Sequence, residues 1–161
     1  VVKDMTQQPR NLHKLLSKAI RIASEAHEKV LDRGGSPYIL HPLRLMFRLR
    51  TDDPELMAIA VLHDVIEDSD WSIEALRHEG FSERVLSALS FLTHDDGSPY
   101  SEYIEGIATN LDAVLVKMED LRDNSDITRL KGVTEKDLKR TEKYHKSFIR
   151  LKEAKKELEF H

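Results

Sequence analysis

An apolar run that leads directly into a cluster of acids and a histidine restricts the fold of this chain more than any other feature. Residues 54–62 are almost wholly apolar after an initial proline and glutamate, which predicts a buried helix with its proline in the first turn. The run His63–Asp68 follows at once and adds one histidine and three acids. On a helix, its histidine and glutamate lie one turn apart, as do its two aspartates. Because burying so much charge is costly without a partner, we expect a divalent cation there.

Helical spacing of apolar residues recurs along the chain, and glycines and prolines fall between the segments. Residues 11–31 form the first predicted helix, with Asn11 as its N-cap. Two adjacent glycines and a proline predict a loop over 32–38. No segment alternates with period two for long enough to form a convincing strand. We therefore predict an all-α, single-domain helical bundle over residues 11–161, preceded by an N-terminal tail of residues 1–10.

Local signals predict where the other helices begin and end. A turn over 51–54 is expected to cap the apolar helix. Gly80 is expected to end the helix that begins after Ser72. The remaining starts are Pro42 at the first position of the second helix, Ser72 and Ser82 as N-caps, Tyr100 for a short helix to Ala108, Leu111 for a helix to Asn124, and a Thr134/Asp137 capping box for the long final helix.

Composition excludes several functional classes. The net charge of −4 argues against a general nucleic-acid binder, which needs a basic surface. No apolar run is long enough to cross a bilayer, no signal-peptide core stands near the first residue, and there are no cysteines. We therefore expect a cytoplasmic protein without a membrane segment, whereas the oligomeric state cannot be read from the sequence.

Three separated polar signals stand at or near helix ends, and packing of these helices side by side would bring them together. His41, His63, Asp64 and Asp120 would then form a mixed imidazole and carboxylate site. Such donors suit manganese, iron, cobalt or zinc, and the lack of thiolates weakens the case for structural zinc. A water on such an ion becomes a nucleophile near neutral pH.

The acids one turn beyond the expected ligands need another role. Glu67 and Asp68 could relay the proton of the attacking water. Asn124, one turn after Asp120, carries both a donor and an acceptor and would suit a substrate hydroxyl or phosphate.

These motifs resemble, in order and spacing, the signatures of the HD-domain metal-dependent phosphohydrolases, in particular the hydrolase domain of the RelA/SpoT proteins and the small alarmone hydrolases. The segments that carry the resemblance are Ala26-His27, Gly35-Ser36-Pro37-Tyr38-Ile39-Leu40-His41-Pro42-Leu43, Leu62-His63-Asp64-Val65-Ile66-Glu67-Asp68, and Val116-Lys117-Met118-Glu119-Asp120 with Asn124. The match runs from about residue 19 to residue 144.

The resemblance implies the chemistry in more detail. One Mn²⁺ would be held by His41, His63, Asp64 and Asp120, with Glu67 and Asp68 as the catalytic pair. The implied reaction removes the 3′-pyrophosphate from guanosine tetra- or pentaphosphate, a small phosphorylated nucleotide. The implied substrate contacts are Asn124, Arg140 and Tyr144, and Arg33 is a further candidate phosphate contact.

The chain departs from the resembled pattern at three positions near the substrate. The family's Arg-Lys pair before the glycine loop is Asp32-Arg33, its Arg after the last metal ligand is Leu121, and its His before the Asn is Asp123. A carboxylate in place of a basic group is expected to repel phosphate. The metal chemistry therefore transfers better than the guanine-nucleotide specificity.

Other interpretations remain open from the sequence. The hydrolase could act on another nucleotide, such as NADPH or a nucleoside phosphate, or the chain could be a non-catalytic protein that senses a nucleotide. A helical protein with no site is the third reading. The candidate phosphate contacts Arg33, Lys117, Arg129 and Arg140 could equally form ordinary surface ion pairs, and His27 is expected in the core or behind the ligands.

Overall fold

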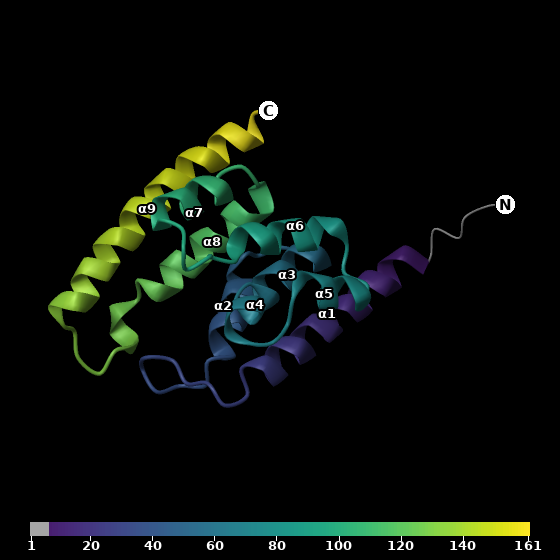
Figure 1. The fold of residues 1–161 in the computed structure, drawn as a ribbon, viewed down its shortest axis with the longest axis horizontal. Helices are drawn as coiled ribbons and strands as arrows, with labels where there is room; N and C mark the ends of the chain where they lie inside the picture. The colour runs from purple at the N-terminus through teal and green to yellow at the C-terminus, as the bar shows by residue number, and fades with distance from the viewer. Residues whose placement is uncertain (1–6) are drawn as a thin grey trace.

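The computed structural model describes residues 7–161, and these fold into helices around one core (Figure 1). The predicted all-α fold is confirmed: within the described part of the chain, the sole β pairing is an isolated bridge between Leu31 and Pro37. No helix in 7–161 has the length and apolarity that a membrane crossing requires. The elements are α1 (Gln7–Ala26), α2 (Leu40–Arg48), α3 (Pro54–Leu62), α4 (Val65–Asp68), α5 (Ile73–His78), α6 (Glu83–Leu92), α7 (Tyr100–Ile107), α8 (Leu111–Asn124), the 3₁₀ turn η1 (Ile127–Arg129) and α9 (Glu135–Glu159).

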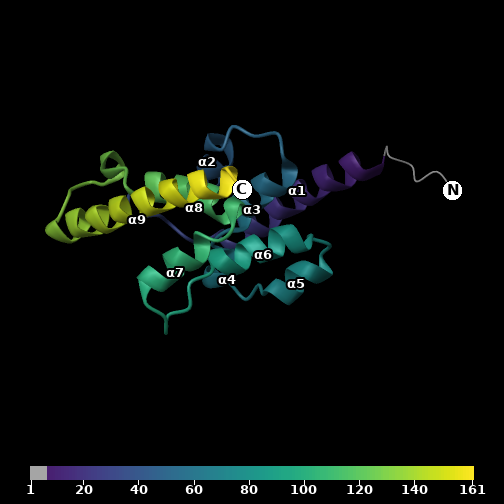
Figure 2. The same ribbon diagram turned by 90° about the horizontal axis from the view of Figure 1, so that it is seen from above.

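The apolar helix α3 lies at the centre of the molecule. Figures 1 and 2 show α1 along one side of it and α8 with the long α9 on the other, and α2 and α6 also pack against it. A helix that is apolar on all sides is expected to be surrounded in this way. Its fully buried residues are Ile59, Ala60, Val61 and Leu62. Because α3 is enclosed, the polar residues that follow it emerge inside the bundle rather than at its surface.

Local capping signals account for most helix starts. Asp53 accepts a hydrogen bond from the backbone N–H of Glu55 at 3.0 Å, directly before Pro54. The predicted N-caps Ser72 and Ser82 and the capping box of Thr134 with Asp137 are all present. Gly80, with φ of +98°, ends the α5 segment as predicted.

Three predicted boundaries are wrong. Helix α1 begins at Gln7 and ends at Ala26, so residues 7–10 belong to the helix rather than to a tail, and Asn11 is not its cap. The rest of the predicted tail, residues 1–6, lies outside the described residues. After α1 the chain turns into paired backbone, with Tyr38 N–H donating to Val30 O at 2.9 Å. Helix α2 begins at Leu40, which puts Pro42 within the first turn instead of at its first position.

The helix that leads into the His63–Asp68 run is interrupted. Helix α3 ends at Leu62, residues 63 and 64 form a turn, and α4 then covers Val65–Asp68. At the break, His63 turns its Nδ1 back to the carbonyl of Ala60 at 2.8 Å. The predicted continuous helix through this motif is therefore wrong. The break separates His63 and Asp64 from the pair on α4.

Candidate active site

Three helices each bring one metal-binding side chain to the same point inside the bundle. His41 lies in the first turn of α2, His63 follows α3, and Asp120 lies on α8. One donor atom of each lies within 4.8 Å of the others. All three residues are buried, with at most 4% of their surface exposed.

The fourth predicted ligand, Asp64, lies beside both imidazoles. Its Oδ2 is 2.9 Å from Nε2 of His63 and 3.8 Å from Nε2 of His41. On the other side, Oδ1 of Asp120 is 3.0 Å from Nε2 of His41 and 3.6 Å from Nε2 of His63. With metal–ligand bonds of about 2.1 Å, neighbouring ligand atoms on one ion lie roughly 3.0–3.4 Å apart. The spacing of His41, His63 and Asp120 therefore fits a single divalent cation, whereas Asp64 lies beside both imidazoles but outside this group of three.

The two imidazole nitrogens that face this point lack hydrogen-bond partners. Within residues 7–161, Nε2 of His41 and Nε2 of His63 are buried and receive or donate no hydrogen bond. Buried polar atoms without partners are uncommon and call for an explanation such as an ion. Each ring is anchored through its other nitrogen, to Asp123 for His41 and to a backbone carbonyl for His63. The unpartnered atoms are thus the ones that a metal would bind.

The electrostatics of this cluster also favour a cation. Burial alone would lower the pKa of His63, but the carboxylates of Asp64 and Asp120 raise it well above its usual value. Burial likewise opposes ionisation of Asp120, yet Lys117 and the two imidazoles hold the pKa of that carboxyl well below its usual range. Negative charge is therefore retained at the point where the four groups meet.

Two side chains hold the carboxylates from outside the cluster. Lys117 Nζ donates to Oδ2 of Asp120 at 2.7 Å, leaving Oδ1 toward the imidazoles. The hydroxyl of Tyr38 donates a short hydrogen bond to Asp64. The ammonium group of Lys117 therefore compensates the charge of Asp120 inside the protein, and Lys117 does not form a surface ion pair.

Asp123, one of the departures from the resembled pattern, has a place in the structure that the sequence did not indicate. It is fully buried, and its Oδ2 accepts from Nδ1 of His41 at 2.6 Å. Burial would raise the pKa of Asp123, but the hydrogen bonds from His41 and Arg44 keep it well below its usual value. Its charge faces the imidazole of His41 and the guanidiniums of three arginines.

Asp32, the other acid that departs from the family pattern, is also compensated. Its Oδ1 accepts the backbone N–H groups of Gly34 and Ser36, each at 2.9 Å. Its Oδ2 lies 3.4 Å from Nη1 of Arg129. The carboxylate therefore closes the glycine loop and ties it to η1. The third departure, Leu121, is buried in the core.

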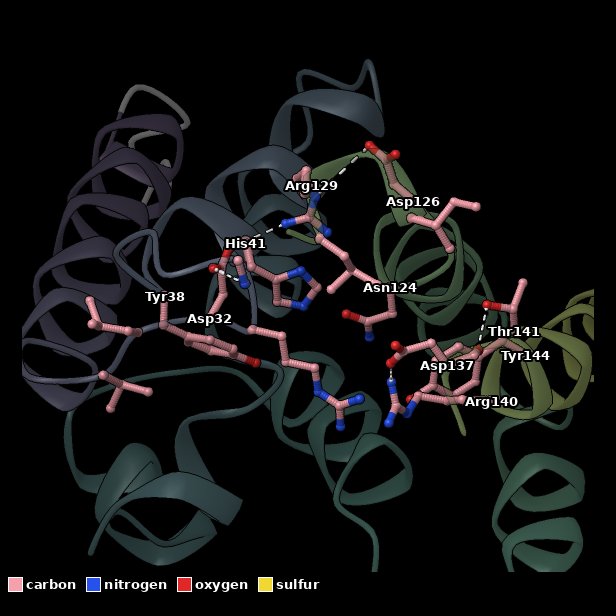
Figure 3. Close-up of a pocket in the computed structure, with 16 residues that line it drawn as sticks. Asp32, Tyr38, His41, Asn124, Asp126, Arg129, Asp137, Arg140, Thr141 and Tyr144 are labelled. Carbon is pink, nitrogen blue, oxygen red and sulfur yellow. Dashed lines mark hydrogen bonds and ion pairs between the residues drawn. The ribbon is translucent and has the colours of Figure 1, made fainter. Parts of the chain in front are cut away.

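A cavity of about 340 Å³ opens beside His41, between the glycine loop and the start of α9. Figure 3 shows His41 and Asn124 at its middle, Asp32 and Tyr38 on one side, and Arg140 and Tyr144 on the other. All four predicted substrate contacts, Arg33, Asn124, Arg140 and Tyr144, line this cavity. Asn124 donates from its Nδ2 to Oδ1 of Asp120 at 2.8 Å, which links the cavity directly to the metal cluster.

The predicted catalytic pair does not line this cavity. Glu67 and Asp68 line a different hollow with His94, whose backbone N–H donates to Glu67. Burial raises the pKa of Asp68 to about 6, and the neighbouring carboxylates of Asp64 and Glu67 add to the effect. Burial also raises the pKa of Glu67. Both acids are thus within electrostatic reach of Asp64 and His63.

His27 lies behind the cluster, as expected. It is 2% exposed, and its ring centroid is 4.8 Å from that of Tyr38. Burial lowers the pKa of the His27 ring, although the nearby carboxylate of Asp64 acts in the opposite direction.

Known proteins with similar sequences carry related names. The chain is 30% identical over 119 residues to a guanosine-3′,5′-bis(diphosphate) 3′-pyrophosphohydrolase of Aquifex aeolicus, which covers 68% of this chain and 17% of that protein. It is 32% identical over 123 residues to a probable enzyme of the same name from Synechocystis, covering 74% of this chain and 16% of the relative. The bifunctional (p)ppGpp synthase/hydrolase SpoT of Escherichia coli is 30% identical over 121 residues, covering 73% and 17%. This chain thus spans less than a fifth of the length of these relatives.

A solved structure shares the fold. It is described as a metazoan ortholog of SpoT that hydrolyzes ppGpp; it superposes with a TM-score of 0.71 at 23% identity and covers 84% of each chain. No protein-family model matches the chain. The relatives and the shared fold confirm the resemblance to the RelA/SpoT hydrolase domain that the motifs indicated.

Proposed function

We propose that this chain is a metal-dependent phosphohydrolase that removes pyrophosphate from the 3′ position of guanosine 3′,5′-bis(diphosphate). One observation carries the proposal: two buried imidazole nitrogens without partners face two carboxylates, next to a cavity of about 340 Å³ lined with arginines. The names of the relatives support the substrate. A nucleotide substrate of this kind supports a cytoplasmic location, and we propose that the helices from Gln7 to Glu159 belong to one hydrolase domain.

The proposed metal site consists of His41, His63, Asp64 and Asp120. We propose Mn²⁺ as the ion, because imidazole and carboxylate donors without thiolate suit it. When bound, such an ion acts as a Lewis acid toward phosphate and lowers the pKa of a water to near neutrality. Lys117 and Tyr38 keep the ligand carboxylates in place through their hydrogen bonds.

The remaining side chains divide the work of proton transfer and substrate binding. Glu67 and Asp68 have raised pKa values, which brings them closer to the working range of a general acid or base. Asn124 uses one amide hydrogen on Asp120, so its carbonyl oxygen and second hydrogen remain for the substrate. Arg33, Arg140 and Tyr144 contact the nucleotide from the cavity wall.

The charges of the cavity favour a second candidate substrate, a nucleotide with fewer phosphates such as NADPH or a nucleoside phosphate. Arg129 is already paired with Asp32 and Asp123, and Arg140 with Asp137. Among the described residues of the cavity wall, Arg33 is left without an ion pair. A tetraphosphate needs more compensation than one free guanidinium provides.

The test is turnover by purified protein loaded with Mn²⁺. We expect release of pyrophosphate from guanosine 3′,5′-bis(diphosphate), and its absence together with activity on NADPH or a nucleoside phosphate would move the substrate to the second candidate. Glu67→Gln should abolish turnover while leaving the metal bound, and Glu102→Gln, an exposed acid on α7, should change neither. Nucleotide binding without turnover of any compound would contradict the enzyme and favour a nucleotide sensor.

A further inference from the structure

We infer that Asp123 is a positioning residue for the metal site: its carboxylate holds the Nδ1 proton of His41 and thereby aims the ring's Nε2 at Asp64 and Asp120. The inference rests on the proposed metal-dependent function. It concerns a residue at which this chain departs from the family that it resembles.

Asp123 is built into the interior as an acceptor. It is 0% exposed, and its Oδ2 lies 2.6 Å from Nδ1 of His41. Arg44 forms a two-pronged contact, Nε to Oδ1 at 2.9 Å and Nη2 to Oδ2 at 3.0 Å. Arg48 donates to Oδ1 at 2.9 Å, and Arg129 donates to Oδ2 at 3.1 Å. One buried carboxylate thus receives hydrogen bonds from an imidazole and three guanidiniums.

These contacts determine which group donates the hydrogen bond between Asp123 and His41. Three arginines stabilise the ionised form of the Asp123 carboxylate. The carboxylate therefore accepts the hydrogen bond from His41 and does not donate one. A neutral imidazole has one N–H and one lone pair. With the N–H held at Nδ1 by Asp123, the lone pair is left on Nε2, the nitrogen that faces Asp64 and Asp120.

The second imidazole is anchored in a comparable way. His63 directs its Nδ1 to the carbonyl of Ala60 at 2.8 Å, and its Nε2 faces the same carboxylates. Both rings therefore have an acceptor behind Nδ1, a backbone carbonyl in one case and Asp123 in the other. An acceptor in this position raises the basicity of the ligand nitrogen and fixes the ring, and its loss typically costs 10–100-fold in metal affinity.

The direct test is Mn²⁺ affinity, measured by titration of metal-free protein with the free ion followed by its paramagnetic resonance signal. Asp123→Asn should weaken binding by about 10–100-fold. Asp112→Asn is the matched control, since Asp112 lies on the same helix and is paired with Arg84 at 2.8 Å. Its affinity should equal that of the wild type. Wild-type affinity in a folded Asp123→Asn protein would overturn the inference.

A second measurement needs no variant. In ¹⁵N-histidine-labelled wild type without metal, at a pH where the ring is neutral, His41 should carry its proton on Nδ1, protected from exchange with water. A proton on Nε2 would overturn the inference even if Asp123→Asn failed to fold. If the wild type bound no Mn²⁺, the proposed function would fail, while the tautomer of His41 would still show whether Asp123 positions the ring.

Discussion

Gly34 is the position at which a single methyl group should disturb the substrate cavity without touching the metal cluster. An added Cβ there would lie 2.5 Å from the carbonyl oxygen of Arg129 and 3.3 Å from Oδ1 of Asp32. Ordinary contact begins at 3.4 Å, so the glycine loop and η1 must separate by about 0.9 Å. The nearest obstacle is backbone, and no rotation of a side chain relieves the clash.

Gly34→Ala should therefore lower the free energy of unfolding by about 1–3 kcal/mol, the usual cost of forcing extra volume into a packed site. The separation also stretches the contact of Arg129 with Asp32, now 3.4 Å, and widens the mouth of the cavity that Gly34 lines. We expect KM to rise more than kcat falls, because the metal ligands lie on other segments. Urea unfolding and steady-state kinetics measure the two effects.

Gly132 offers the matched control in the connection that follows η1. A Cβ at this position meets no atom within 4 Å, so Gly132→Ala should leave KM unchanged and stability equal or up to about 1 kcal/mol higher, through a less flexible unfolded chain. The reasoning is refuted if Gly34→Ala unfolds at the wild-type urea concentration, or if both variants lose the same stability.

Other expected outcomes concern charge. Asp123→Asn should cost about 3–5 kcal/mol of stability at neutral pH, because three guanidiniums lose their buried partner. The pKa of Asp123 is held low in the folded protein, so its contribution exists above the unfolded pKa of about 4 and is lost as the pH falls toward the folded value; urea unfolding should show the difference from wild type shrinking from about pH 5 to about pH 2. Glu67→Gln should lower the pKa of Asp68 from about 6, since a like charge is removed; ¹³C NMR titration of metal-free protein measures it, and an unchanged pKa would contradict the assigned cause. Mn²⁺ at 100 times its Kd should raise the free energy of unfolding by about 2.7 kcal/mol, and a chelator should reverse the gain. Asp32→Asn keeps an acceptor for the loop and should leave KM for a phosphorylated substrate close to that of wild type. A markedly lower KM would show that the carboxylate of Asp32 does repel the phosphate of the substrate.

The helix starts could be predicted because their causes are local. Asp53, Ser72, Ser82 and Thr134 each cap a helix through backbone groups two or three residues away. The end of helix α1 was placed wrongly because neither glycine nor proline stands between Ala26 and Gly34 to mark it. Its last turn is followed by loop pairing between Val30 and Tyr38, a contact that apolar spacing does not reveal. The break after Leu62 likewise depends on the contacts that His63 makes in the folded protein, which the sequence does not show.

The site was predictable to the extent that residue type alone determines chemistry. His41, His63, Asp64 and Asp120 were expected to meet, and the structure places them side by side. The environment of Asp123 was not predictable, because three of its partners lie 75, 79 and 82 residues away in the chain. A carboxylate in a linear sequence has the same sign whether it faces phosphate or the guanidinium of an arginine.

Whether an acidic side chain already has a cationic partner therefore indicates a binding site more clearly than its charge alone does. Asp32 and Asp123 look unfavourable for a phosphate substrate, yet each is neutralised by cations that the fold supplies. Among residues 7–161, the buried side-chain atoms without a hydrogen-bond partner include the Nε2 atoms of His41 and His63, which lie beside acids whose charge raises the pKa of both rings despite burial. A divalent ion would satisfy both imidazoles and the carboxylate of Asp120 at once, which is why buried groups without partners indicate a metal site.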